Sequence, residues 1–393
     1  MSLWRSALVL GTLSMVGPFA IDMYLPAMPD IAQDLGVGET DIQATVTFYF
    51  LAFGIAQLVY GPWADQSGRK LPVMVGLCIF LAGSAGAALA DTAFSLMLWR
   101  FVQGLGGAVL MVVPRAVVRD LHTGAEATRL MALIMLVISV SPMLAPLAGS
   151  IVIEFASWRV IFAFLFVIAL LGMGMCTFML PETLPPSQRT PIHVKSLLAG
   201  SRVLLSDVRF MGLTLIGAFG MASFFVFLAS AAFVYTGQFG LSPMGFSLAF
   251  AINAVGFFSA SQLAGPLAAR LGLSRVIRLG TAMFAGFSVC LLVITLTTDV
   301  TLPLVVGFLF CANAGLGLVI PTTMVMALED HGDIAGLASS LGGTIQMMMG
   351  GLMILAGSPF FDGTALPMVV VIALCGVSAF ALAIAMGRQP VPA

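Results

Sequence analysis

Two ionisable side chains, Asp22 and Arg100, lie inside long apolar stretches of this sequence. An ionised group in the bilayer costs at least about 2.5–3.5 kcal/mol, so such residues usually face a cavity or a partner. Counted from residues 6 and 95, Asp22 lies about 24 Å and Arg100 about 7 Å along helices that run in opposite directions. Both therefore fall in the outer third of the membrane, within a turn of each other, where they could share a water-filled cavity. The alternative is that Asp22 belongs to a solvated helix end, since Pro26 follows one turn later.

A second set of charges lies in the segment GPWADQSGRK at 61–70, which contains the acid Asp65 and the basic pair Arg69 and Lys70. Asp65 can pair with a nearby base or with a helix N-terminus, which would make this inner loop a latch that changes between conformations. The alternative is a loop that only sets topology, and the spacing alone favours neither.

Other residues inside the apolar stretches are candidates for binding or for helix packing. Arg100 and Gln103 share one helix face beside Gly104, and prolines with a glycine punctuate another stretch at Pro142, Pro146 and Gly149. Both patterns also occur as ordinary packing devices. Neutral amides can orient an uncharged ligand, and aromatic rings can line an apolar pocket or simply pack. These binding candidates are Tyr24, Tyr49, Phe224, Phe225, Phe227, Asn253, Asn313 and Gln346.

The stretches that hold these residues are long enough to cross a membrane. Of the 393 residues, 60% are apolar and 8% are charged, whereas a soluble domain carries about a quarter charged residues. A membrane helix needs about 20 apolar residues, and backbone groups in lipid must be satisfied within the segment. We therefore expect an all-α membrane protein with twelve transmembrane helices, at 6–27, 43–63, 71–90, 95–117, 129–152, 159–180, 209–234, 246–268, 275–297, 301–326, 337–357 and 365–387.

The distribution of charge predicts the orientation of these helices. Thirteen of the 16 Lys and Arg residues fall in alternate connections, and the other connections hold only Arg159. The positive-inside rule then places both termini in the cytoplasm. The net charge of −1 argues against a nucleic-acid partner. The five cysteines lie in apolar runs without metal-ligand spacing, so we expect no metal site.

An internal repeat indicates two six-helix halves. Segments 61–76 and 265–280 align at a constant offset, with Gly61, Pro62, Ala64, Gly68 and Gly76 matched in the second copy. The second copy has no counterpart of Asp65 or Arg69. Same-sense repeats are typical of transporters whose binding site lies between the halves. We expect an N-terminal half at 1–180, a cytoplasmic linker at 181–208 and a C-terminal half at 209–393.

Three motifs resemble those of the major facilitator superfamily. The signature G-x-x-x-D-x-x-G-R-[KR] is matched at 61–70, and the fourth-helix motif R-x-x-Q-G at 100–104. The fifth helix resembles the antiporter motif through Pro146 and Gly149, with Ala145 where a glycine is usual. Within the superfamily, FAIDMYLPAMP, SWRVIF and PET resemble the Bcr/CflA group of multidrug exporters, which includes the bicyclomycin and chloramphenicol/florfenicol type.

The resemblance implies a monomeric antiporter of the bacterial inner membrane that confers antibiotic resistance by alternating access. Asp22 would carry the proton and link to substrate, Arg100 would tune it, and the segment Gly61, Asp65, Gly68, Arg69 and Lys70 would gate the cytoplasmic side. The partners would be a small amphipathic drug, protons and the bilayer, with a proton gradient in place of a cofactor. Ser14 stands where some relatives carry a second acid, so dicationic drugs are not expected.

Three alternatives remain at this point. The same scaffold could export a sugar or another small metabolite, although the spans are rich in Phe and Met. A membrane enzyme could use the acidic loop LEDHGD at 328–333, which also reads as a solvated loop. A passive channel is disfavoured by two internal charges in one half, and ATP drive by the lack of a G-x-x-x-x-G-K-[ST] loop.

Overall fold

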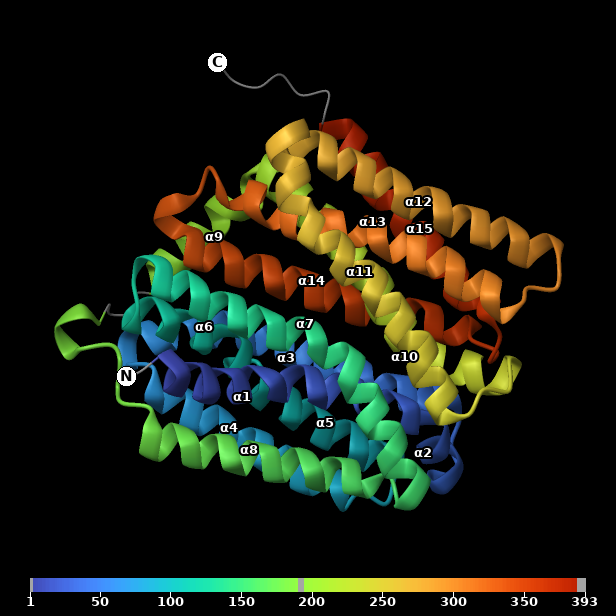
Figure 1. Ribbon diagram of the computed structural model, residues 1–393, viewed down its shortest axis with the longest axis horizontal. Helices are drawn as coiled ribbons and strands as arrows, with labels where there is room; N and C mark the ends of the chain where they lie inside the picture. Colours follow the sequence, from blue (N-terminus) through green and yellow to red (C-terminus); the bar gives the residue numbers. More distant parts are fainter. Residues whose placement is uncertain (1–2, 190–193, 387–393) are drawn as a thin grey trace. The chain divides into compact units, whose positions relative to one another are not determined.

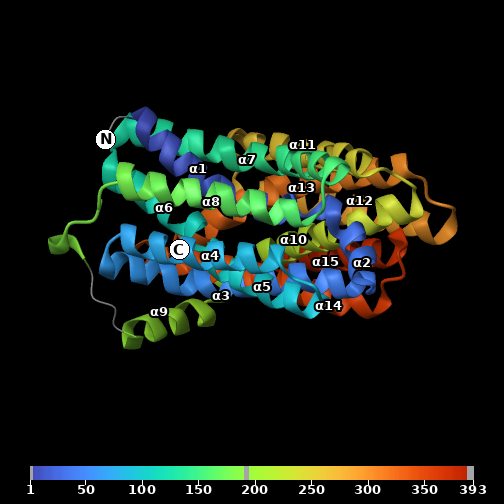
Figure 2. The same cartoon turned by 90° about the horizontal axis from the view of Figure 1, so that it is seen from below.

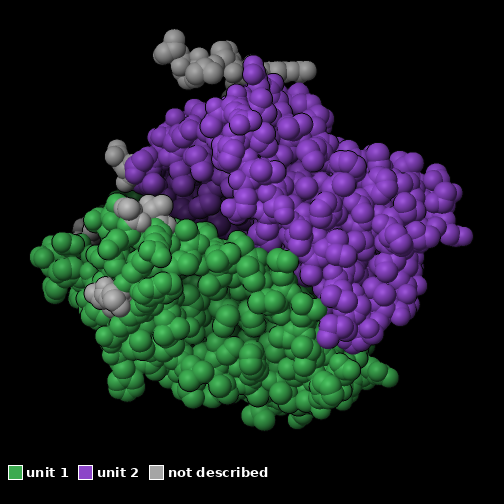
Figure 3. Space-filling model, viewed as in Figure 1, with its two compact units in different colours: residues 1–197 green, residues 198–393 purple. Residues whose placement is uncertain are grey.

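The computed structural model describes residues 3–189 and 194–386. It divides into two compact units, residues 1–197 and 198–393 (Figure 3), and the boundary falls inside the predicted linker interval. Every regular element of the described residues is helical. Twelve helices are long and apolar enough to cross a membrane, which confirms the predicted all-α class and the number of spans.

Unit 1 contains the first six spans (Figure 1). Within it α5 packs against α3 and α4, α1 packs against α7 and α8, and α4 packs against α8. Figures 1 and 2 both show α1 alongside α7 and α8. The fourth span consists of α5 and α6, which meet at Ala108. The bounds are α1 (Leu3–Asp22), α2 (Met28–Leu35), α3 (Glu39–Ser67), α4 (Lys70–Ala88), α5 (Ala93–Gly107), α6 (Val109–Leu121), α7 (Gly124–Phe155) and α8 (Arg159–Met179).

The first span is interrupted in its second half. Helix α1 ends at Asp22, a short 3₁₀ turn follows at Leu25–Ala27, and α2 continues from Met28. Pro26 has no backbone N–H, so a regular helix would lose a hydrogen bond there. The span therefore runs over Leu3–Leu35 and extends beyond the predicted end at residue 27.

Unit 2 contains the other six spans. Helix α13 packs against α11 and α12, α10 packs against α13, α14 and α15, and α12 packs against α15. Part of the predicted linker is a helix, α9, which the sequence analysis did not anticipate. The bounds are α9 (Val194–Ser206), α10 (Val208–Phe233), the π-helical turn η3 (Val234–Gln238), α11 (Pro243–Leu271), α12 (Leu273–Thr297), α13 (Leu302–Leu328), α14 (Ala335–Gly357) and α15 (Ala365–Met386). Shorter 3₁₀ turns are Pro186–Gln188 in unit 1, and Gly332–Ile334 and Ser358–Phe360 in unit 2.

Glycines allow α4 and α5 to approach closely in unit 1. A Cβ atom at Gly106 would lie 2.4 Å from the Phe80 nitrogen and 2.5 Å from the Gly76 carbonyl oxygen. Because backbone atoms cannot swing away as a flexible side chain can, any larger residue must separate the two helices. This crossing supports Arg100 and Gln103, which lie on α5 one to two turns before it.

We expect Gly106→Val to destabilise unit 1 by more than about 1 kcal/mol, since overpacking a tight contact typically costs about 1–3 kcal/mol. The midpoint of thermal unfolding in detergent should fall by at least roughly 2–4 °C. The matched control is Gly174→Val on α8, where no atom lies within 4 Å of the added Cβ. Equal midpoints for the two variants would show that the α4–α5 crossing tolerates separation.

Candidate functional site

Arg100 lies in a fully buried aromatic cage in unit 1. Its side chain is 0% exposed. The guanidinium carbon lies 4.7 Å from the ring centre of Tyr24 and 4.4 Å from that of Tyr49, with Phe162 at 5.8 Å. Cation–π contacts of this kind strengthen when water is excluded. Two predicted binding candidates, Tyr24 and Tyr49, therefore enclose the base directly.

Hydrogen bonds hold one side of the Arg100 guanidinium in place. Nη1 donates to the carbonyl oxygen of Ala20 at 2.9 Å and to Oε1 of Gln103 at 2.5 Å. Gln103 in turn donates from Nε2 to the Ser84 hydroxyl at 2.8 Å. Arg100 and Gln103 thus share one network as predicted, and this network joins α1, α4 and α5.

The other side of the guanidinium has no partner. Among the described residues, Nε and Nη2 of Arg100 form no hydrogen bond, and no carboxylate oxygen lies within 4.0 Å. The expected attraction between Asp22 and Arg100 therefore does not take the form of an ion pair in this conformation. Their link is indirect, because Arg100 binds the carbonyl of Ala20, two residues before Asp22. Helical depth placed the two residues in one region, but it does not determine where their side chains point.

Asp22 is the last residue of α1 and is only 4% exposed. The alternative interpretation placed Asp22 at a solvated helix end. Asp22 does lie at a helix end, but its carboxyl group is buried and not solvated. Helix α7 approaches the break that follows, where a Cβ at Gly149 would lie 2.2 Å from the Met23 carbonyl oxygen. Gly149 of the predicted proline and glycine motif therefore packs beside the candidate acid. Pro142 and Pro146 lie inside α7, which continues to Phe155.

The predicted inner loop at 61–70 is mostly helical, which corrects the sequence analysis. Helix α3 continues through Gly61 and Asp65 to Ser67, although Pro62 lies inside it. The chain leaves the helix at Gly68, whose φ of +95° favours glycine. Helix α4 then begins at Lys70, so the turn itself is only two residues long.

The Arg69 side chain connects α3 to α6. It contacts Asp65 at 2.5 Å between Nη1 and Oδ1, and Asp120 at 2.8 Å between Nε and Oδ2. The Asp120 side chain is 16% exposed and that of Asp65 is 56% exposed, so the Arg69–Asp120 contact is the better shielded from solvent. The ion pair of Asp65 and Arg69 is therefore present within unit 1, with Asp120 as a partner that spacing did not reveal. We call this charged cluster the latch, and its opening during a conformational change stays a prediction.

Glu182 is a site residue that the sequence analysis missed. Its carboxylate accepts hydrogen bonds from the backbone N–H groups of Arg69 at 2.8 Å and Lys70 at 3.1 Å, at the start of α4. An acid at a helix N-terminus satisfies free N–H groups and the helix dipole. The next residue, Thr183, donates to Asp120 at 3.0 Å. The PET segment at 181–183 thus completes the latch, although it was noted only as part of a family resemblance.

The environment of Glu182 favours its ionised form. Partial burial acts to raise the pKa of its carboxyl group. The N–H groups of Leu184, Arg69 and Lys70 and the charge of Arg189 outweigh that effect and hold the pKa below its ordinary value. The latch therefore contains three carboxylates, Asp65, Asp120 and Glu182, around one arginine.

The binding candidates of unit 2 are distributed over several contacts. Asn313 donates from Nδ2 to Oδ1 of Asn253 at 3.3 Å, and Phe227 stacks on Phe250 with ring centres 5.6 Å apart. The remaining candidates lie in other contacts. Phe224 stacks on Phe257, Phe225 packs where a Cβ at Gly350 would fall, and Gln346 lies beside Gly217, with Thr323 near the same glycine.

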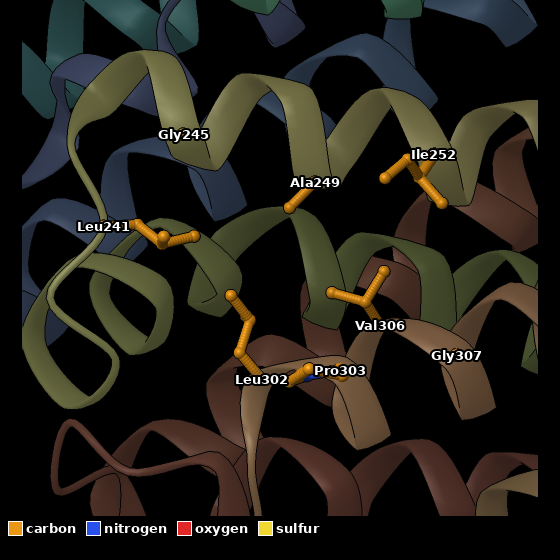
Figure 4. A pocket seen from close by; sticks show the side chains of 8 residues that line it. All are labelled: Leu241, Gly245, Ala249, Ile252, Leu302, Pro303, Val306 and Gly307. Carbon is orange, nitrogen blue, oxygen red and sulfur yellow. The ribbon is translucent and has the colours of Figure 1, made fainter.

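An apolar groove of about 420 Å³ lies between α11 and α13 (Figure 4). It contains no charged or amide side chain, so it offers nothing to orient a polar ligand. None of the predicted binding residues lines it. The lining residues are Leu241, Gly245, Ala249, Ile252, Leu302, Pro303, Val306 and Gly307.

The acidic loop at 328–333 forms ion pairs with the start of α10. Asp330 contacts Arg209 at 2.7 Å, and Nε2 of His331 lies 2.9 Å from the Asp207 carboxylate. The side chain of Asp333 lies outside the described residues. Among those described, no three His, Cys, Asp or Glu side chains gather as metal ligands. The loop therefore connects the end of α13 to the start of α10 through charged contacts within unit 2.

Comparison with known proteins identifies a family. The Major Facilitator Superfamily model matches residues 10–354. An uncharacterized MFS-type transporter of Bacillus subtilis is 33% identical over 92% of this chain and 90% of its own. A bicyclomycin resistance protein homolog of Haemophilus influenzae is 29% identical (94% and 92%), and a chloramphenicol resistance protein of Pseudomonas aeruginosa 30% (94% and 87%). A D-xylose-proton symporter structure has a TM-score of 0.76 at 14% identity, covering 99% of this chain and 98% of that one.

We expect Glu182→Gln to lower the thermal midpoint of the purified protein at pH 7 by roughly 2–4 °C, because a charged helix-terminus contact contributes about 1 kcal/mol. A carboxyl group whose pKa is lowered by folding stabilises the fold above its unfolded pKa and loses that contribution as the pH falls through its folded pKa. The difference between the variant and the wild type should therefore shrink as the pH falls from 7 towards 3.

The matched control for this measurement is Glu154→Gln, which alters an exposed glutamate at the other end of the unit. Its midpoint should follow the wild type at every pH. If Glu182→Gln does so as well, Glu182 does not stabilise the start of α4.

Proposed function

This chain belongs to the Major Facilitator Superfamily, and we propose that it exports small amphipathic drugs of the phenicol or bicyclomycin type in exchange for protons. It is a multi-pass membrane transporter rather than an enzyme, and its similarity to bicyclomycin and chloramphenicol resistance proteins supports a drug exporter of the Bcr/CflA type. The observation that carries the proton coupling is the buried carboxyl group of Asp22, at a helix break that Arg100 binds from α5.

Asp22 is suited to carry the proton because it is a buried acid within a broken span. Discontinuous membrane helices often form the coupling sites of transporters. Two nitrogens of Arg100, Nε and Nη2, have no hydrogen-bond partner among the described residues, so a change in the charge of Asp22 alters the electrostatic balance around the cage. Coupling requires such an interaction to differ between the access states. Arg100→Ala should impair transport as well, because it removes the base that binds the end of α1 two residues before Asp22.

The second element of the proposal is a gate at the latch of Asp65, Arg69, Asp120 and Glu182. Its ion pairs connect Arg69, at the start of α4, to α3 and α6, and hydrogen bonds from backbone N–H groups connect the same point to Glu182 after α8. Because Arg69 and its neighbouring N–H groups make all of these contacts, a movement of α4 relative to α3 and α6 would break several of them together. This supports the idea that the loop signature controls the cytoplasmic side.

The two units share internal contacts that support an origin as repeats. In unit 2, a Cβ at Gly280 would lie 2.8 Å from the Gly315 carbonyl, and one at Gly315 would lie 2.6 Å from the Gly280 carbonyl. This is the counterpart of the crossing of Gly76 and Gly106 in unit 1, and Gly76 aligns with Gly280 in the sequence repeat. The same pairs of spans also pack against each other in each unit, for example the second with the fourth and the first with the fifth.

We propose that the protein is a monomer in the bacterial inner membrane, with both termini in the cytoplasm. It needs no cofactor, since a proton moving through 100 mV supplies about 2.3 kcal/mol. Neutral drugs fit a site with one acid and one base better than dications do, because a second positive charge would remain uncompensated. A sugar or metabolite exporter is disfavoured by the few hydroxyl groups among the candidate residues.

We expect expression in a pump-deficient bacterial host to lower susceptibility to phenicols or bicyclomycin more than to permanently dicationic drugs. Asp22→Asn should abolish this effect and also efflux against an imposed pH gradient in proteoliposomes. Asparagine keeps the shape of the side chain but cannot carry the exchanged proton.

The matched control is Asp299→Asn, which alters an exposed acid outside the spans and should transport as the wild type does. Protein levels and insertion are compared for each variant. Wild-type proton-driven efflux by Asp22→Asn would place the coupling site elsewhere. Resistance to dications without resistance to phenicols would contradict the proposed substrate class.

The proposed orientation predicts that cysteines at Ser187 and Gly38 react with an impermeant thiol reagent from opposite sides of the membrane. Both positions are exposed and lie between spans. Ser187 follows the sixth span on the base-rich side, whereas Gly38 follows the first span near Asp34, Glu39 and Asp41. Five spans lie between the two positions, so they should face opposite sides. Labelling of both positions from the same side would contradict this arrangement.

A further inference from the structure

We propose that Tyr235, Asn253 and Asn313 form a subsite of unit 2 that binds an uncharged hydroxyl or secondary amide group of the transported molecule. The inference rests on the proposed export function and specifies how the substrate is recognised. The three residues come from the π-helical turn η3, from α11 and from α13, so the cluster joins three spans of one unit.

The Tyr235 hydroxyl is the first observation. Tyr235 is 0% exposed, and among the described residues its hydroxyl has no hydrogen-bond partner. The Asn253 side chain lies close enough to interact with it, although the geometry falls short of a hydrogen bond. A buried hydroxyl without a partner is unfavourable, so this group is available to a ligand that brings one.

The two asparagines keep unused hydrogen-bonding capacity. Asn253 donates to the Ala249 carbonyl at 3.1 Å and accepts from Asn313 at 3.3 Å. Each amide has two N–H donors and an oxygen with two lone pairs. Asn253 therefore has a donor and a lone pair left, and Asn313 has a donor and its carbonyl oxygen. Both residues are at most 5% exposed, so bulk water does not satisfy these groups freely.

The backbone around Tyr235 has an unusual form. Residues Val234–Gln238 adopt a π-helical turn directly after α10. Such turns are uncommon and occur frequently at functional sites, because the wider turn redirects a side chain. Tyr235 is the second residue of this turn and lies beside Asn253 of the next span.

Phenylalanine rings surround the hydroxyl-bearing ring. The centre of the Tyr235 ring lies 6.3 Å from that of Phe227, 6.4 Å from Phe239 and 6.0 Å from Phe246. In such an apolar setting hydrogen bonds are stronger than in water, and an unmatched polar group is costly. The subsite should therefore discriminate sharply between ligands that present a hydrogen-bonding group and ligands that do not.

The charge of the cluster determines the class of ligand group. None of the three side chains is charged, and neither η3 nor α13 contains a charged residue. A cation placed here would be buried without compensation. A hydroxyl or a secondary amide is neutral and acts as both donor and acceptor, which matches the free groups of the tyrosine and the two amides. Because an alternating-access carrier closes its site on one side in each state, burial in this conformation is compatible with binding in another.

The test measures binding of thiamphenicol and florfenicol, two phenicols that differ by one hydroxyl replaced by fluorine. The full chain is reconstituted in nanodiscs, and dissociation constants are compared for the wild type, Tyr235→Phe and Asn253→Leu. We expect Tyr235→Phe to weaken thiamphenicol binding about five- to tenfold. The matched control is Tyr60→Phe, a buried tyrosine of α3 in unit 1, which should leave both constants within twofold. Thermal midpoints establish that each variant is folded.

The outcomes separate the subsite from the export function. A loss confined to thiamphenicol assigns its primary hydroxyl to the subsite, and an equal loss for both drugs assigns the amide or the secondary hydroxyl that they share. Constants within twofold of the wild type in folded Tyr235→Phe would overturn the proposal and leave the cluster as a structural one. A wild type that binds neither drug would overturn it too. Binding by a wild type that exports neither drug would contradict the export function alone.

Discussion

The buried guanidinium of Arg100 is the constraint on which the organisation of unit 1 depends. A charge of this kind is stable in a membrane span only if rings and acceptors surround it. Tyr24 and Tyr49 supply the rings, the Ala20 carbonyl and Gln103 supply the acceptors, and these groups come from different helices. Satisfying one side chain therefore fixes how α1, α3 and α5 meet. It also leaves Asp22 at the point where α1 breaks.

The two units differ in the kind of polar side chain that they bury. Unit 1 buries a base beside an acid and carries an ion-paired latch around Arg69. Unit 2 buries neutral amides and a phenol among phenylalanines, and its paired charges lie at the start of α10. Similar crossings of glycine-bearing helices thus support one unit suited to exchange of charge and another suited to recognition of neutral groups.

Hydrophobic length and charge placement predicted the twelve spans, and the three-residue spacing predicted the contact of Arg100 with Gln103. Helical depth predicted the common region of Asp22 and Arg100, but the guanidinium turns to a backbone carbonyl. Glu182 was missed because it joins α4 from 113 residues away, which no local pattern records. The π-helical turn at Tyr235 was missed because the residues V-Y-T-G-Q do not distinguish a π-helical turn from the ordinary end of an α-helix.

The choice of a main-chain oxygen as the acceptor for Arg100 affects how the sequence can vary. Every amino acid presents the same carbonyl, so no side-chain replacement at Ala20 can delete this acceptor. The position is restricted by size instead, since Ala20 is 0% exposed. The contact between the fourth span and the end of α1 therefore tolerates a change of side-chain chemistry at residue 20, but it depends wholly on Arg100. We expect relatives of this protein to vary more at position 20 than at position 100.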